Sequence, residues 1–232
     1  LPHIQHAIWI DVTGEGADEP GFMRFSDLIK SGNADDPRLP QVAKLLHAHD
    51  AINIQFTSGT TGFPKGATLT HRNILNNGFF IGECMKLTPD DRLCIPVPLY
   101  HCFGMVLGNL ACFTHGSTIV YPSDAFDPLA VLQTVQAERC TGLHGVPTMF
   151  IGELEHPDFA KYDLSNLRGG FMAGAPCPVQ LMRKVADKMH MKEVVILYGL
   201  TEASPLITAT TISDSLELRA TTVGKIIPGL EI

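Results

Sequence analysis

The chain has 232 residues, of which 45% are hydrophobic and 18% charged, and its formal net charge is −7. This length suits one large domain or two small ones, and an acidic chain without a Lys/Arg run is not expected to bind nucleic acid. No apolar run reaches the roughly 18–20 residues that a membrane-spanning helix needs. A transmembrane protein is therefore not expected either.

The first fifty residues predict one strand and two helices. Ala7–Val12 is rich in apolar residues of strand type, Phe22–Gly32 has helical spacing and ends on a glycine, and Asp36–Asp50 predicts a second helix. We take residues 1–51 as an N-terminal α/β segment of a truncated domain. The chain has no initiator Met, and it stops within a predicted strand in Val223–Ile232, so we expect it to be a piece of a longer protein.

Residues 52–232 predict one larger core in which strands and helices alternate. The stretches Ile52–Phe56 and Ala67–His71 are prone to β structure, and His71–Met85 has helical spacing. Further strands are expected at Arg92–Val97, Ser117–Tyr121, Thr141–Gly145, Leu167–Ala173 and Glu193–Tyr198, and helices at Cys102–Thr114, Pro128–Arg139, Pro147–Glu155 and Pro178–His190. Repeated βα units predict an α/β fold with a mainly parallel sheet flanked by helices, in which ligands gather at the carboxyl ends of the strands.

The loop between the first two of these strands has the composition of a phosphate-binding loop. The segment "TSGTTGFPKG", Thr57–Gly66, combines glycines, which let a backbone approach a polyphosphate, with hydroxyl donors and one lysine. It is not a Walker A loop, because Lys65 follows a proline and precedes a glycine. The alternative is a flexible hairpin loop. The candidate ligands are Thr57, Ser58, Gly59, Thr60, Thr61, Gly62 and Lys65.

Two later loops also follow predicted strands. "LYGLTEAS", Leu197–Ser204, offers Tyr198 to stack on a base, Thr201 to donate to a phosphate and Glu202 to bind Mg²⁺. "FMAGAPCP", Phe171–Pro178, has small residues that would let a flat ligand lie against the backbone. Either segment alone is ordinary, since a Tyr-Gly pair often ends a strand and small residues often precede a helix.

Together and in this order, the three segments resemble the adenylate-forming superfamily of acyl-CoA synthetases, luciferases and peptide-synthetase adenylation domains. "TSGTTGFPKG" is similar to its phosphate-loop signature, "YGLTEAS" to its YGxTE motif and "GAP" at Gly174–Pro176 to its adenine-side motif. The resemblance implies that the first loop binds ATP phosphates and that Glu202 binds Mg²⁺. Thr201 would contact the α-phosphate, and Gly174, Ala175, Pro176, Tyr198 and Gly199 would hold AMP.

A fourth segment, "VPLYHCFGMVLG" at Val97–Gly108, resembles the acyl-pocket motif of that superfamily. We expect a role in catalysis for His101, although a histidine beside apolar residues is more often part of a core. The peptide-synthetase members of the superfamily generally have an aspartate near this segment that binds the substrate amine, and this sequence has none there. A neutral, lipophilic acid is therefore the better fit. Among acyl-CoA synthetases, the resemblance is greatest to the medium-chain fatty-acid group. The expected pocket wall is apolar and consists of Phe103, Met105, Val106, Met149, Phe171 and Met172.

The resemblance implies a ligase that converts a fatty acid, ATP and coenzyme A into acyl-CoA, AMP and pyrophosphate. The small C-terminal domain of the superfamily, with its lysine, is absent from this sequence, so we expect the chain alone to be poorly active. The alternatives are a non-catalytic nucleotide-binding or scaffolding fragment and a P-loop phosphotransferase, which would release ADP. The sequence leaves the oligomeric state open.

The six cysteines bear on the compartment. They form no CxxC pair and most lie in apolar runs, which favours reduced core thiols over disulfides or a zinc site. We expect a cytoplasmic protein, or one of the mitochondrial matrix if the source is eukaryotic.

Overall fold

The computed structural model describes residues 3–10, 20–58 and 62–231. They fall into two compact units, Leu1–Leu46 and His47–Ile232. In the first unit, β1 (Ile8–Trp9) pairs in parallel with β2 (Met23–Arg24), and α1 (Phe25–Ser31) follows. The predicted helix that ends on Gly32 is confirmed, and the strand predicted at Ala7–Val12 is present over two of its described residues.

The helix predicted over Asp36–Asp50 is wrong, because only α2 (Leu39–Ala43) forms. Carboxylates at both ends of that range bind the backbone locally. Asp36 accepts a hydrogen bond from the N–H of Arg38 at 2.9 Å, and Asp50 accepts one from the N–H of His47 at 2.7 Å. Such turns compete with helix formation.

The second unit starts with an antiparallel hairpin of β3 (Ala51–Thr57) and β4 (Lys65–Thr70). Helix α3 (His71–Met85) begins directly after it and has the predicted bounds. The Thr70 hydroxyl accepts a hydrogen bond from the N–H of Asn73 at 3.2 Å, which caps the helix. Buried Ile74, Ile81 and Met85 recur at helical spacing and bind this helix to the core.

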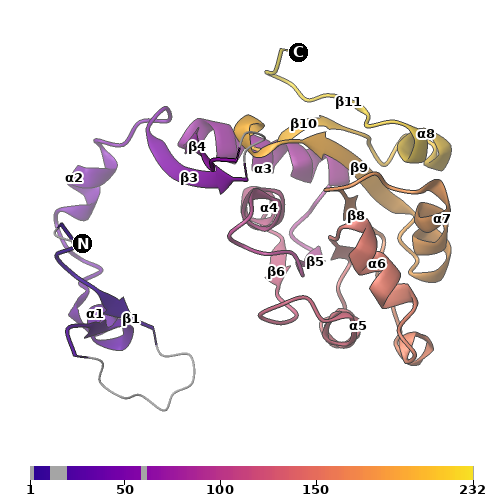
Figure 1. Ribbon diagram of the computed structural model, residues 1–232, viewed down its shortest axis with the longest axis horizontal. Helices are drawn as coiled ribbons and strands as arrows, with labels where there is room; N and C mark the ends of the chain where they lie inside the picture. The colour runs from indigo at the N-terminus through magenta and orange to yellow at the C-terminus, as the bar shows by residue number, and fades with distance from the viewer. Residues whose placement is uncertain (1–2, 11–19, 59–61, 232) are drawn as a thin grey trace. The chain divides into compact units, whose positions relative to one another are not determined.

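A seven-stranded sheet forms the centre of this unit (Figure 1). Its order is β11-β10-β9-β8-β7-β5-β6. The strands are β5 (Arg92–Cys94), β6 (Thr118–Val120), β7 (Gly142–Leu143), β8 (Gly169–Met172), β9 (Glu193–Gly199), β10 (Leu206–Ala209) and β11 (Lys225–Ile226). The five neighbouring strands β6, β5, β7, β8 and β9 are parallel, whereas β10 and β11 run antiparallel to their neighbours. The predicted α/β fold with a mainly parallel sheet is confirmed.

The remaining helical segments are η1 (Phe103–Leu110), α4 (Ala111–His115), α5 (Pro128–Ala137), α6 (Pro147–Leu154), η2 (Phe159–Lys161), α7 (Val179–Lys188), η3 (Thr201–Ala203) and α8 (Leu216–Thr221). Of these, α5, α6 and α7 differ from the predictions mainly at their ends, whereas η2, η3 and α8 were not predicted. The predicted helix at Cys102–Thr114 is a π-helix, η1, continued by the α-helix α4. Among the described helices, none combines the length and the hydropathy that crossing a membrane requires.

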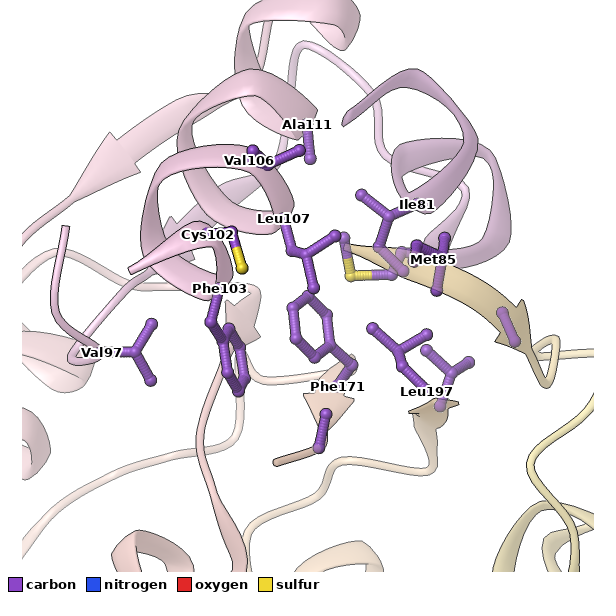
Figure 2. Packing of buried hydrophobic residues seen from close by; sticks show 14 of the residues in the cluster. Ile81, Met85, Val97, Cys102, Phe103, Val106, Leu107, Ala111, Phe171 and Leu197 are labelled. Carbon is purple, nitrogen blue, oxygen red and sulfur yellow. The ribbon is translucent and has the colours of Figure 1, made fainter. Parts of the chain in front are cut away.

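Helices cover both faces of the sheet and create two apolar cores. The first contains residues of α3, η1 and α4 with Phe171, Val195 and Leu197 of the strands. The second contains residues of α5, α6 and α7 with Met172 and Val194 of the same strands. Alternate strand residues thus face opposite layers. Figure 2 shows the first core, in which Phe103 and Phe171 lie side by side under η1. Because both faces of the sheet are covered by helices, a ligand site is expected at the carboxyl ends of the strands.

Candidate functional site

The hairpin of β3 and β4 carries the predicted phosphate loop. Thr57, the last residue of β3, pairs with Lys65, the first residue of β4, so the two ends of the loop lie opposite each other. Ser58 follows Thr57, and Gly62 has a φ of +93°, a conformation that favours glycine. The other three candidates, Gly59, Thr60 and Thr61, lie outside the described residues. Strand β4 packs beside η3, which brings the hairpin next to the Thr201 turn.

The predicted YGxTE segment forms the end of β9 and a tight turn. Tyr198 and Gly199 end the strand, and Thr201 and Glu202 form η3. The N–H of Leu200 donates to the carbonyl of Pro205 at 2.9 Å, which closes the turn. A Cβ on Gly199 would lie 1.9 Å from that same carbonyl oxygen. Only a glycine therefore fits here, and Glu202 is left exposed at the tip of the turn.

His101 lies where the chain enters η1. Its Nδ1 accepts a hydrogen bond from the N–H of Phe103 at 3.0 Å, so in this arrangement the other ring nitrogen, Nε2, carries the proton of the neutral ring. The next residue, Cys102, places its sulfur 3.6 Å from the hydroxyl oxygen of Thr201. Burial raises the pKa of the Cys102 thiol, so this contact involves a neutral thiol. Residues 99 positions apart thus connect η1 to the turn of η3.

These segments surround one cavity of about 240 Å³ at the carboxyl end of the sheet. It brings together His101, Phe103, Gly174, Tyr198 and Thr201. Its other lining residues are Cys102, Leu107, Ala173, Leu197, Gly199, Leu200, Pro205 and Leu206. Residues predicted from three separate motifs therefore meet at one place, where the imidazole of His101 and the hydroxyls of Tyr198 and Thr201 lie among mostly apolar walls.

A larger groove of about 860 Å³ lies on the other side of Tyr198. It is lined by Gly174, Ala175 and Pro176, by Cys177, by the end of β9 and by residues 220–224, which are the last two residues of α8 and the three that follow it. Tyr198 is half-exposed and, with Gly174, Leu197 and Gly199, borders both spaces. The predicted adenine-side residues thus form a wall of a groove that shares four lining residues with the first cavity.

The six residues of the predicted acyl pocket do not line one cavity. Phe103 reaches the cavity of about 240 Å³ and stacks on Phe171, with their ring centroids 4.7 Å apart. Val106 and Phe171 are fully buried, and Met149 packs against the same core. Met105 points toward β3, where the amide nitrogen of Asn53 lies 3.8 Å from its sulfur. Met172 packs in the opposite core, because it follows Phe171 on a strand.

The donor set at Glu202 fits a metal ion only if a nucleotide comes with it. The described part of the chain contains no group of three His, Cys, Asp or Glu side chains that could hold a metal ion. Mg²⁺ is usually bound through one or two carboxylates together with substrate phosphates. The exposed carboxylate of Glu202, next to the predicted phosphate loop, fits such a site, in which the nucleotide supplies the other oxygen ligands.

His144 is a residue of this region that the motifs did not reveal. It follows β7, is fully buried, and its Nε2 donates to the carbonyl of Leu107 in η1 at 3.2 Å. Its Nδ1 accepts from the N–H of Phe171 at 3.3 Å. Burial lowers the pKa of His144 to about 3, so the ring is neutral. It lies within the strand predicted at Thr141–Gly145, so its place near the carboxyl end of a predicted strand was the one available signal.

Comparison with known sequences places the chain in a family. Residues 10–232 match the family model described as AMP-binding enzyme. The chain is similar to the acyl-CoA ligase sidI of Aspergillus fumigatus, with 55% identity over 209 residues, 90% of this chain and 35% of that protein. It is 46% identical over 234 residues to the mitochondrial medium-chain acyl-CoA ligase ACSF2 of Danio rerio, which covers 100% of this chain and 38% of that protein.

Solved structures agree on the fold. The anthranilate CoA ligase AuaEII, in complex with anthranoyl-AMP, superposes with a TM-score of 0.82 at 23% identity, covering 99% of this chain and 42% of that one. ATP-bound MatB from Rhodopseudomonas palustris superposes with a TM-score of 0.66 at 32% identity, covering 79% of this chain and 35% of that one. The chain spans less than half the length of these proteins, and it belongs to the family of AMP-binding enzymes.

Proposed function

We propose that the protein containing this chain activates a carboxylic acid with ATP and passes the acyl group to coenzyme A. The observation that carries this proposal is the meeting of His101, Tyr198 and Thr201 at one cavity beside the Lys65 hairpin. Names of relatives support it, since those with 46% and 55% identity are acyl-CoA ligases. Because the chain covers only 35–38% of their length, the activity belongs to the whole protein.

The reaction would take place in two displacement steps. A carboxylate oxygen attacks the α-phosphorus of ATP, an O–P bond forms, the bond to the β-phosphate oxygen breaks, and pyrophosphate leaves. The thiol sulfur of coenzyme A then attacks the acyl carbon, a C–S bond forms, and AMP leaves as the C–O bond breaks. The thiol proton goes to solvent or base. Since three anionic groups meet in the first step, catalysis depends mainly on charge neutralisation and positioning.

The residues of this chain have distinct proposed tasks in the first step. Lys65 and the donors of the hairpin loop would hold the β- and γ-phosphates, and Thr201 would donate to the α-phosphate. Tyr198 and Gly174–Pro176 would hold the adenine in the larger groove. His101, with a proton on Nε2, would donate a hydrogen bond to the acid at the cavity wall. When bound through Glu202 and phosphate oxygens, Mg²⁺ would neutralise charge on the phosphates.

We propose a medium-chain fatty acid as the substrate. The Danio rerio relative is named for medium-chain acids, and the cavity next to His101 is mostly apolar. Its volume of about 240 Å³ is below the ~300–1,000 Å³ that is common for ligand pockets, which favours a compact acid. For the compartment we propose the cytoplasm, with the mitochondrial matrix as the alternative that the name of this relative supports.

Product analysis of the protein that contains this chain tests the proposal. We expect octanoate, ATP and Mg²⁺ to yield AMP and pyrophosphate, with octanoyl-CoA only when coenzyme A is present. The variant Glu202→Gln should need more Mg²⁺ and turn over more slowly. Glu155→Gln, at an exposed glutamate after α6, is the matched control. ADP as product, or AMP that does not depend on the acid, would contradict the proposal.

A further inference from the structure

Asn77 forms a paired contact across the first core that no sequence motif indicated. It lies in α3 and is 4% exposed. Its Nδ2 donates to the carbonyl of Leu206 at 3.1 Å, and its Oδ1 accepts from the N–H of Leu206 at 2.7 Å. One side chain therefore satisfies both polar groups of a backbone unit that lies 129 positions later in the chain.

The backbone of Leu206 depends on this contact. Leu206 is fully buried, and it begins β10 opposite Gly199, at a place where the register between β9 and β10 shifts. A buried peptide group without a partner is costly, so the strand needs a donor and an acceptor on this side. The asparagine amide offers both in one plane, whereas an aspartate keeps only the acceptor and an alanine keeps neither.

Leu206 is also where the Thr201–Glu202 turn is anchored. The turn starts from Gly199 and returns at Pro205, whose carbonyl accepts from the N–H of Leu200. Pro205 and Leu206 line the same cavity of about 240 Å³ as Thr201. The position of Leu206 therefore sets the base of the turn, and Asn77 holds Leu206 from the layer of helices.

We propose that Asn77 is a positioning residue that holds the Thr201–Glu202 turn in register with the α-phosphate and its Mg²⁺. This inference rests on the function proposed above. Asn77 touches no substrate, and it acts through the backbone of Leu206. Its loss should therefore reduce the steps that depend on Thr201 and Glu202 more than it reduces acid binding against the η1 wall.

The test compares Asn77→Ala and Asn77→Asp with Asn76→Ala in the protein that contains this chain. Asn76 is the exposed neighbour on α3 and makes no side-chain hydrogen bond that the structure describes. A second control, Val131→Ala, opens the opposite core without contacting the turn. Small displacements at a reaction centre can cost orders of magnitude in rate. We expect Asn77→Ala to lower kcat by roughly tenfold or more. The Mg²⁺ concentration for half-maximal rate should rise, with the KM of the acid unchanged within about twofold.

Hydrogen exchange of the backbone amides at positions 200–204 and 206 supplies a readout that does not need activity. Asn77→Ala should exchange roughly tenfold faster there than Asn76→Ala. Asn77→Asp, which keeps the acceptor for the N–H of Leu206, should be intermediate and serves if the alanine variant does not fold.

Two sets of results are distinguishable. If Asn77→Ala and Asn77→Asp lose thermal stability as Val131→Ala does, with kcat, Mg²⁺ dependence and local exchange like those of Asn76→Ala, the inference about Asn77 is overturned while the proposed function stands. A wild-type protein that releases no AMP overturns the proposed function and the positioning role with it, and the exchange experiment then decides only whether Asn77 fixes the turn.

Discussion

Arg168 donates to both carboxylate oxygens of Asp91, from Nε to Oδ1 at 3.0 Å and from Nη2 to Oδ2 at 2.8 Å. The same guanidinium donates to the carbonyls of Met85 and Lys86 at the end of α3, and to Glu193 at 2.7 Å. Asp91, Arg168 and Glu193 lie at the amino ends of β5, β8 and β9, respectively. One arginine thus joins a helix to three strands, at the edge of the sheet opposite the candidate site.

We expect Arg168→Ala to lower the free energy of unfolding by about 3–5 kcal/mol, because it leaves the buried carboxylate of Asp91 without its cationic partner. Arg183→Ala is the control, since its pair with Glu217 is exposed on both sides, and should change stability by no more than about 1 kcal/mol. Urea denaturation measures both. Equal losses in the two variants would contradict a structural role specific to Arg168.

Glu153 is a buried ionisable group that, unlike Asp91, lacks a hydrogen-bond partner in the described structure. It lies on α6, is fully buried, and neither of its carboxylate oxygens has a hydrogen-bond partner in the described structure. Burial raises the pKa of Glu153 well above its ordinary value of 4.5, so the folded protein holds it protonated. The unfolded chain releases that proton once the pH exceeds about 4.5.

The stability of the folded state should therefore fall as the pH rises above about 4.5, by about 1.4 kcal/mol for each pH unit, until the raised pKa is reached. Glu153→Gln cannot ionise and should lack this part of the pH dependence, and it should be more stable than wild type at neutral pH. Denaturation midpoints from pH 4 to pH 8 measure it. Exposed Glu155→Gln should keep the slope of the wild type, and the same slope in Glu153→Gln would refute this account.

The elements that the sequence predicted well are those whose signals are local. Helix α3 has a threonine cap, apolar residues at helical spacing and no proline, and its bounds were predicted. Strand β10 and helix α8 were not predicted, because β10 is short and derives its pairing from β9 rather than from its own pattern. The sequence predicted an ordinary helix where the structure has the π-helix η1. Its form depends on packing, since a Cβ on Gly108 would lie 2.8 Å from the Ile95 side chain.

The candidate site shows the same division. The contiguous motifs identified Thr201, Tyr198 and His101, and the fold brings them to one cavity. The pocket prediction placed Phe171 and Met172 on one wall, which was wrong, because adjacent residues of the strand face opposite cores. The sequence also could not identify His144 or Asn77. The partner of His144, Leu107, lies 37 positions earlier in the chain, and the partner of Asn77, Leu206, lies 129 positions later. Only the folded backbone brings these partners close.

His144 should support the cavity wall without titrating. His144→Phe keeps an aromatic ring but removes the buried hydrogen bonds to the carbonyl of Leu107 and the N–H of Phe171, so we expect a loss of roughly 2–5 kcal/mol in the free energy of unfolding. Since Leu107 lines the cavity, the KM of the acid should rise while the KM of ATP changes little. His49→Phe, at an exposed position, is the control.

The pH dependence of the rate gives a separate check on His144. Because burial lowers its pKa to about 3, the ring stays neutral in ordinary assay buffers. The rate profiles of wild type and His144→Phe should therefore have the same shape between pH 5 and 9 and differ only in height. A transition near neutral pH that disappears in His144→Phe would show that the ring is not held in the neutral form.

Gly199 offers the most direct test of the turn that carries Thr201 and Glu202. A Cβ at this position would lie 1.9 Å from the carbonyl oxygen of Pro205. That oxygen belongs to the backbone, so the turn itself must shift to make room. We expect Gly199→Ala to abolish acid-dependent AMP formation almost completely, since a displacement of about 1 Å at a reaction centre can cost roughly a hundredfold in rate. Nucleotide release measured at saturating substrate checks it.

The control for Gly199→Ala is a glycine whose Cβ would meet only ordinary contacts. Gly152 lies in α6, where the nearest atom would be 3.8 Å away on the ring of Phe126. Gly152→Ala should retain the rate of the wild type and gain up to about 1 kcal/mol of stability, because alanine favours a helix over glycine. If Gly199→Ala instead turns over like Gly152→Ala, the exact path of the chain from Gly199 to Pro205 does not matter for catalysis, and a role for Thr201 and Glu202 in the reaction would have to be abandoned.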